Sequence, residues 1–128
     1  LMDTLSPEWA PWAFSVVNHS CATGYYSFAH EIGHNQGAHH DIANAGGAST
    51  IYPYAHGYQD PNGAFRTVMA YNCPGGCTRI QHFANPNVLY GGVPTGEPTY
   101  AADGLAIDQT AATVAAFRAR VTGVPPGC

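Results

Sequence analysis

Lysine is absent from this chain of 128 residues, so all four of its basic residues are arginines. Charged side chains make up only 9% of the chain, and the formal net charge is -4. Such a chain has no basic stripe for nucleic acid or for an anionic membrane surface. It also lacks an apolar run of the roughly 20 residues that a membrane-spanning helix needs. These absences argue against nucleic-acid-binding and membrane-spanning proteins, and the length allows one domain.

Four cysteines in a chain rich in glycine, proline and tyrosine indicate an oxidising compartment outside the cytoplasm. Cys73 and Cys77 enclose only Pro-Gly-Gly, which favours a local disulfide and leaves Cys21 to pair with Cys128. In the rival interpretation, Cys73 and Cys77 bind a zinc ion, but the other pair of ligands that such a site needs is missing. We therefore expect a secreted protein, extracellular or periplasmic, with at least one disulfide bond.

The pattern of apolar residues predicts a strand and two helices. Residues 11–17 are typical of a short buried strand. A helix is expected from about residue 23 to Gly37, a glycine suited to the left-handed conformation that ends helices. Gly33 lies inside this helix at a cost of about 1 kcal/mol relative to alanine, which indicates close packing. A second helix is expected over residues 103–121. Glycine and proline predict long irregular loops over residues 42–64 and 72–98.

The most informative segment contains four of the seven histidines within eleven residues and runs His30-Glu31-Ile32-Gly33-His34-Asn35-Gln36-Gly37-Ala38-His39-His40. Imidazoles four residues apart on a helix can reach one metal ion, because their side chains lie one turn apart. Gly37 permits a sharp turn, after which His40 supplies a third nitrogen. The pattern H-E-x-x-H-x-x-G-x-x-H therefore predicts that His30, His34 and His40 bind one metal ion and leave a coordination position open.

Glu31 follows directly after the first predicted ligand. A metal ion with three nitrogen ligands lowers the pKa of a bound water to about 7 and polarises a peptide carbonyl. Glu31 is placed to accept the proton of that water as a general base. His39 is out of register with the pattern, so His40 is the third predicted ligand. The remaining histidines are expected to have structural roles: His19, His56 and His82.

The extended histidine pattern resembles that of the metzincin zinc peptidases, in the reprolysin-like, astacin-like and pappalysin-like groups. Thr67-Val68-Met69-Ala70-Tyr71 resembles the Met-turn that runs beneath their zinc ion, although Met69 could alternatively only fill the core. Asp41, directly after the third histidine, points to reprolysins, whereas Met69-Ala70-Tyr71 points elsewhere. Phe83-Ala84-Asn85-Pro86 resembles a Phe-Ser-Asn-Pro segment of several secreted members. The resemblance extends from about residue 22 to residue 120.

This resemblance implies an α+β fold with an active-site helix, a C-terminal helix and long irregular loops. It implies one catalytic zinc ion at the floor of a cleft that binds an extended peptide. Tyr71 matches the position of a tyrosine that can approach the metal and stabilise the oxyanion in astacin-like and serralysin-like enzymes. Only 29 residues precede His30, too few for the N-terminal sheet of these enzymes. We expect residues 1–128 to form a single zinc-peptidase catalytic domain that lacks most of that sheet.

Three functions are consistent with these residues. The leading hypothesis is a zinc-dependent endopeptidase that acts on peptide or protein substrates. The second is an inactive, zinc-bound fragment with a structural role, which associates with the missing N-terminal part or a larger assembly. The third is a non-catalytic metal-binding module, a hypothesis that explains the three histidines but does not explain why a glutamate is at position 31. A structural calcium ion near Asp60 and Asn62 is a further hypothesis that rests on two oxygen ligands.

Overall fold

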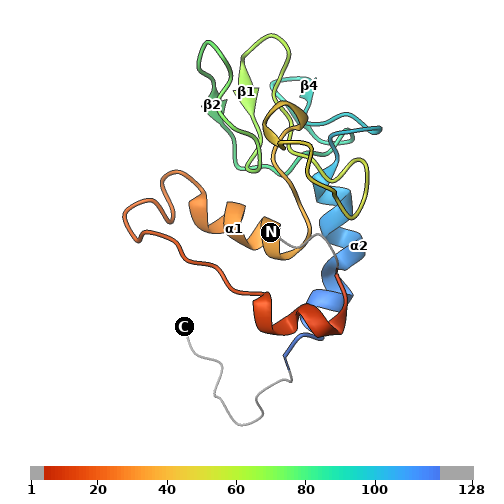
Figure 1. The fold of residues 1–128 in the computed structure, drawn as a ribbon. Helices are drawn as coiled ribbons and strands as arrows, with labels where there is room; N and C mark the ends of the chain where they lie inside the picture. The colour runs from red at the N-terminus through yellow and green to blue at the C-terminus, as the bar shows by residue number, and fades with distance from the viewer. Residues whose placement is uncertain (1–4, 119–128) are drawn as a thin grey trace.

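The computed structural model describes residues 5–118 and combines helices with two small ladders, as expected for an α+β fold (Figure 1). No helix in this range has the length and the apolar character needed to cross a bilayer. The helical elements, in chain order, are η1 (Pro7–Trp12), α1 (Ser27–Asn35), η2 (Ile42–Asn44) and α2 (Asp103–Ala115). The strands are β1 (Phe65–Arg66), β2 (Thr78–Arg79), β3 (Leu89–Tyr90) and β4 (Val93–Pro94).

Helix α1 is shorter at its start than the sequence predicted. Tyr26 has a φ of 56°, in the left-handed region, so the helix cannot extend back to residue 23. At the other end the helix stops at Asn35, and Gly37 adopts a φ of 82°. A Cβ atom on Gly37 would lie 1.9 Å from Ile51 Cδ1. Gly37 is therefore required both for the reversal of the chain and for its close approach to Ile51.

The strand predicted over residues 11–17 is wrong. Pro7–Trp12 form a 3-10 helix, and residues 13–17 pair with no described strand. Pro7 and Pro11 carry no backbone N–H, which weakens any ladder at this point but suits a short helical turn. Phe14 and Val16 are exposed, so the apolar residues that suggested a buried strand are not covered by residues 5–118.

The four strands form two separate pairs. Strands β1 and β2 are parallel, with Phe65 opposite Thr78 and Arg66 opposite Arg79. Strands β3 and β4 are antiparallel and are joined by Gly91 and Gly92, whose φ values of 58° and 84° suit a tight hairpin. The rest of this region is irregular, as its glycines and prolines predicted. In Figure 1, β1 and β2 lie on the far side of α1 from η1.

The core lies between α1, the 67–71 turn and α2. Its buried centre consists of Ala38, Val68 and Met69, and partly buried side chains pack around it: Tyr26, Ala29, Phe83 and Ile107. The Thr110 hydroxyl of α2 donates a hydrogen bond of 2.8 Å to the Gln36 carbonyl. This bond fixes α2 against the end of α1. Helix α2 ends at Ala115 instead of residue 121, and residues 119–121 lie outside the described part of the chain.

Candidate metal centre

The three predicted metal ligands come together at the C-terminal part of α1. His30 and His34 are one helical turn apart, and the turn at Gly37 returns the chain so that His40 faces them. His40 Nε2 lies 3.2 Å from His30 Nε2 and 3.1 Å from His34 Nε2. All three ligand atoms lie within 4.8 Å of one another. Two nitrogens bound tetrahedrally to zinc at about 2.0–2.1 Å are about 3.3 Å apart, so the site fits such an ion with little adjustment.

Backbone carbonyls orient the two helix histidines. His30 Nδ1 lies 2.9 Å from the Val68 carbonyl oxygen, and His34 Nδ1 lies 2.9 Å from the Ala38 carbonyl oxygen. A carbonyl oxygen can only accept, so each Nδ1 must carry the hydrogen atom. The lone pair of each Nε2 is then directed at the shared site. The sequence pattern identified these histidines but gave no sign of their carbonyl partners, which come from tertiary contacts.

A short bridge holds the third histidine in place. His39 N–H donates to the Ala55 carbonyl at 2.7 Å, and Gly57 N–H donates to the His39 carbonyl at 2.9 Å. His56 Nδ1 lies 2.8 Å from the carbonyl oxygen of His40. His56 is therefore in the structural position that was expected, where it fixes the backbone of His40. Gly57 also lets the backbone of Met69 and Ala70 approach this segment, because a Cβ atom on Gly57 would lie 2.7 Å from Ala70 N.

The surroundings keep all three imidazoles neutral at pH 7. Burial lowers the pKa of His34 to about 3 and that of His40 to about 4, and the positive charge of a neighbouring protonated histidine adds to both shifts. Burial also lowers the pKa of His30, and the charges of Arg79 and Arg66 act in the same direction. Neutral imidazole is the form that binds a metal ion, so no proton has to leave these rings before binding.

Met69 lies fully buried against the middle of α1. A Cβ atom on Gly33 would come within 2.5 Å of Met69 Sδ and 3.0 Å of Phe83 Cε1. The close packing predicted for Gly33 is therefore confirmed, and it explains a glycine inside a helix. Because Val68 holds the His30 ring, the same turn both supports the helix and orients one of its metal ligands.

Asp41 and Tyr71 connect the third histidine to the end of this turn. The buried carboxylate of Asp41 accepts hydrogen bonds from Tyr71 N–H at 2.8 Å and from Asn44 Nδ2 at 2.7 Å. The ring centroid of Tyr71 lies 4.4 Å from that of His40, and the side chain is 46% exposed. The phenol ring is thus next to a predicted ligand and accessible from solvent.

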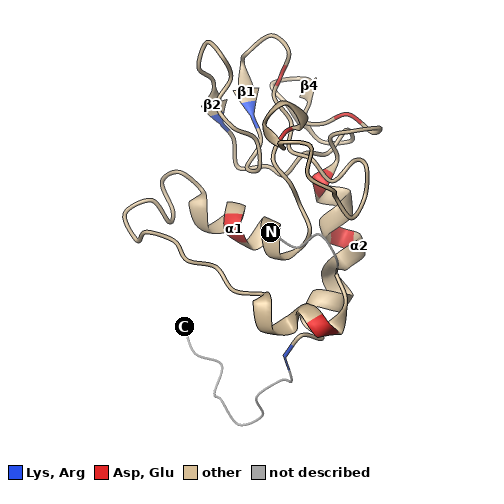
Figure 2. Cartoon of the chain, in the orientation of Figure 1, with Lys and Arg blue, Asp and Glu red and all other residues tan. Residues whose placement is uncertain are grey.

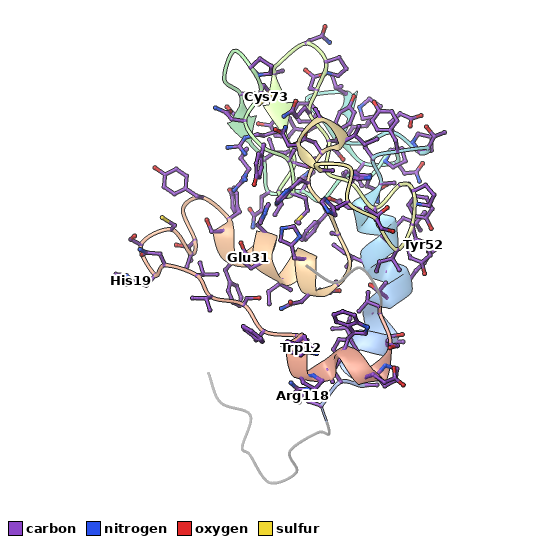
Figure 3. All side chains as sticks on the ribbon, viewed as in Figure 1. Trp12, His19, Glu31, Tyr52, Cys73 and Arg118 are labelled. Carbon is purple, nitrogen blue, oxygen red and sulfur yellow. A yellow bond between two sulfur atoms is a disulfide. The ribbon has the colours of Figure 1, made fainter. Side chains whose placement is uncertain are left out.

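Glu31 lies on α1 beside His30 and is only partly buried (Figure 3). Its charge raises the pKa of His30, which places the carboxylate within electrostatic reach of the site. No hydrogen bond joins the Glu31 carboxylate to another residue in the range 5–118. The group is therefore available to bind a water molecule next to a metal ion.

The cysteine and calcium predictions have different outcomes. Cys73 and Cys77 form a disulfide with an S–S distance of 2.06 Å, which excludes the second zinc site proposed for them. Cys21 forms no disulfide with a described cysteine, and its predicted partner Cys128 lies outside the described residues, so that pairing stays a prediction. Within residues 5–118, the three histidines form the only detected group of three or more His, Cys, Asp or Glu side chains with metal-binding spacing. Asp60 and Asn62 therefore gain no third ligand of these types, and calcium also stays a prediction.

Comparison with known proteins agrees with this geometry. The chain is 50% identical over 112 residues to a protein of Stenotrophomonas maltophilia (strain R551-3) named peptidyl-Asp metalloendopeptidase. The aligned region covers 85% of this chain and 27% of that protein. A protein of the same name from Xanthomonas campestris pv. campestris is 50% identical over 109 residues, with 85% and 26% covered. Another from Pseudomonas fragi is 48% identical over 99 residues, with 77% and 62% covered.

The chain thus spans about a quarter of the length of the Stenotrophomonas and Xanthomonas relatives. No solved structure matches it. The family model described as metallo-peptidase family M12 matches residues 5–84, which is more than half of the chain and includes all three histidines, Glu31 and Met69. The match and the three-histidine site support the same conclusion: this chain belongs to metallo-peptidase family M12.

Proposed function

We propose that this chain carries the catalytic centre of a secreted, zinc-dependent endopeptidase that cleaves peptide bonds next to aspartate. The observation that carries this proposal is the convergence of three neutral imidazoles, with the Glu31 carboxylate alongside. The names of the relatives support the substrate class. The Cys73–Cys77 disulfide supports secretion, because disulfides persist in oxidising compartments.

Three nitrogen ligands with an open position suit zinc. When bound, zinc supplies Lewis-acid activation of a water molecule and of the scissile carbonyl. Glu31 Oε accepts the proton of the attacking water and then delivers it to the amide nitrogen, so that the amine leaves in a neutral form. The Tyr71 hydroxyl donates a hydrogen bond to the oxyanion that develops on the carbonyl oxygen.

We also propose that residues 1–128 form a single catalytic domain lacking most of the N-terminal sheet. The described strands support this proposal, because each ladder has two strands of two residues. Such short ladders are too small to act as the edge of a sheet to which an extended peptide adds as a strand.

The test combines elemental analysis with digestion of an unfolded protein substrate. We expect about one zinc ion per chain, loss of cleavage on addition of a chelator and recovery on addition of zinc. Glu31→Gln should retain zinc and lose at least about 1000-fold in cleavage rate, because the general base is removed. Glu8→Gln, on the exposed surface of η1, is the matched control and should leave the rate unchanged. Bound zinc without chelator-sensitive cleavage would instead support the inactive, structural fragment.

A further inference from the structure

Two arginines meet beside the metal centre. Arg66 and Arg79 are register partners on β1 and β2, where Figure 2 shows a basic residue on each strand. Both guanidinium groups donate to the Ala70 carbonyl, Arg66 from Nη1 at 2.7 Å and Arg79 from Nη2 at 3.3 Å. Arg79 Nη1 also donates to the Tyr25 carbonyl at 2.9 Å, just before α1. The carbonyl oxygen of Ala70, the residue after Met69, therefore accepts hydrogen bonds from two positively charged groups.

Neither guanidinium group forms an ion pair with a carboxylate within residues 5–118. The hydrogen bonds of both guanidinium groups go to backbone carbonyls, and the Nε atom of each is buried without a partner. The charge of Asp41 raises the pKa of Arg66 from a distance, but the Asp41 oxygens accept their hydrogen bonds from Tyr71 and Asn44 and not from the guanidinium group. Two like charges in a partly buried position are unfavourable unless an anion binds them. This arrangement therefore has the properties of an anion-binding site.

The pair is close to the predicted catalytic residues. Val68, whose carbonyl holds the His30 ring, is two residues from Arg66 and two from Ala70. The charges of both arginines act directly on His30. A peptide bound at the three histidines thus has its neighbouring side chains within electrostatic reach of this pair. Nη2 of Arg66 makes no hydrogen bond to a described residue, so it can donate to a ligand.

We infer that Arg66 and Arg79 form the subsite that selects aspartate next to the scissile bond, an inference that rests on the proposed function. Arg66 donates from Nη2 to the aspartate carboxylate, and Arg79 adds the second charge and fixes the position of the pair. Charge-assisted bonds from arginine to carboxylate are stronger than neutral ones. Asparagine has nearly the same shape as aspartate but leaves both charges unpaired, so the pair selects charge rather than size.

The test uses two C-terminally amidated peptides that differ only by Asp or Asn beside the cleaved bond. For the zinc-loaded enzyme we expect kcat/KM to favour the Asp peptide by at least about a hundredfold. Arg66→Gln should reduce this ratio at least about tenfold by slowing the Asp peptide alone, and Arg66→Lys should restore part of it. The matched control is Arg118→Gln. Arg118 is exposed after α2 and bonds to the Ala10 carbonyl, so its loss should leave the ratio unchanged.

A binding measurement separates failure of the subsite from failure of the proposed function. In a Glu31→Gln background, calorimetry should show tighter binding of the Asp peptide, and this preference should be lost with Arg66→Gln. If the parent enzyme cleaves neither peptide, the proposed function fails, but the binding ratio still tests the arginine pair. Equal slowing of both peptides by Arg66→Gln, or an unchanged ratio, overturns the inference. Competition by inorganic phosphate without any Asp preference also overturns it, because the site then binds small free anions only.

Discussion

The two sides of α1 differ in how fully this chain covers them. On one side, Gly33 touches Met69 and Phe83, and the His30 ring is tied to Val68. On the other side, Phe28 is 56% exposed and lines a hollow of about 370 Å³ together with residues such as Tyr26 and Gln81. The comparison shows that residues 65–84 cover the metal-binding side of α1, whereas no described segment fully covers the side that carries Phe28.

The exposed side continues into the segment before α1. Trp12, Phe14 and Val16 are all exposed, and Figure 1 shows the chain leaving η1 away from α2, on the side of α1 that faces away from β1 and β2. Substitutions on the two sides should therefore have different consequences. Changes on the metal-binding side should alter metal affinity or folding, and changes on the open side should alter neither strongly.

The largest effect is expected at a metal ligand. His34→Ala should lower the zinc affinity at least about a hundredfold, because loss of a residue that only supports a ligand already costs 10- to 100-fold. His19→Ala is the matched control, since His19 is exposed on the loop before α1 (Figure 3). Competition with a coloured chelator measures both affinities. Similar affinities for the two variants would show that His34 is not a ligand.

Glycine substitutions test the packing of α1 directly. Gly33→Ala should lower the free energy of unfolding by about 1–2 kcal/mol, because displacement of the buried Met69 outweighs the better helix propensity of alanine. Gly24→Ala should change it by less than about 0.5 kcal/mol, since nothing lies within 4 Å of the added methyl group. Urea unfolding of both variants gives the two values. A stabilised Gly33→Ala protein would mean that Met69 can move aside freely.

A smaller effect is expected on the open side. Phe28→Ser should change the free energy of unfolding by less than about 1 kcal/mol, because most of the ring is already in water. Phe65→Ala is the comparison, since Phe65 is 1% exposed and its loss should cost about 3–5 kcal/mol. Thermal unfolding distinguishes these outcomes. Equal losses would indicate that the side chain of Phe28 is covered in solution.

The smallest effect concerns pH. Folding lowers the pKa values of His34 and His40 to about 3 and about 4, so these rings are unprotonated at every pH above about 5. Zinc therefore displaces no proton from them near neutrality, and its apparent affinity should change less than about threefold between pH 8 and pH 6. Below about pH 4 the protons compete and the affinity should fall steeply. A tenfold loss per pH unit starting at pH 6.5 would contradict the depressed values.

The same depressed values predict how acid affects the metal-free protein. The unfolded chain takes up protons on these histidines below about pH 6.5, whereas the folded chain does so only near pH 3–4. The unfolded state thus binds more protons in this window, and stability should decrease as the pH falls through it. Urea unfolding of the metal-free protein between pH 7 and pH 4 measures the slope.

The sequence predicted those parts of the site that depend on local spacing. Both helices and the order of the three histidines follow from periodicity and from the glycine after α1. The strand over 11–17 was wrong because Pro7 and Pro11 favoured a helical turn. The start of α1 was misplaced because Tyr26, a bulky residue, adopts a left-handed conformation that sequence alone rarely indicates.

Other features depend on contacts between distant segments, so no local pattern contains them. Strands β1 and β2 have two residues each, too few for a period-two signal. The carbonyls of Val68 and Ala38 carry no side-chain signature, yet they determine how His30 and His34 face the site. The meeting of Arg66 and Arg79 at one oxygen likewise results from strand pairing.

The carbonyl bonds to His30 and His34 have a consequence for the assembly of the protein. In small zinc domains the ion organises the ligands, and the chain folds only when the metal arrives. Here hydrogen bonds to backbone carbonyls of the same chain already orient two of the three imidazole rings, so folding does not have to wait for zinc. The ion can be the last component to enter, after the chain has folded and the Cys73–Cys77 disulfide has formed. The rate of its uptake is then limited by diffusion into the open site and not by rearrangement of the polypeptide.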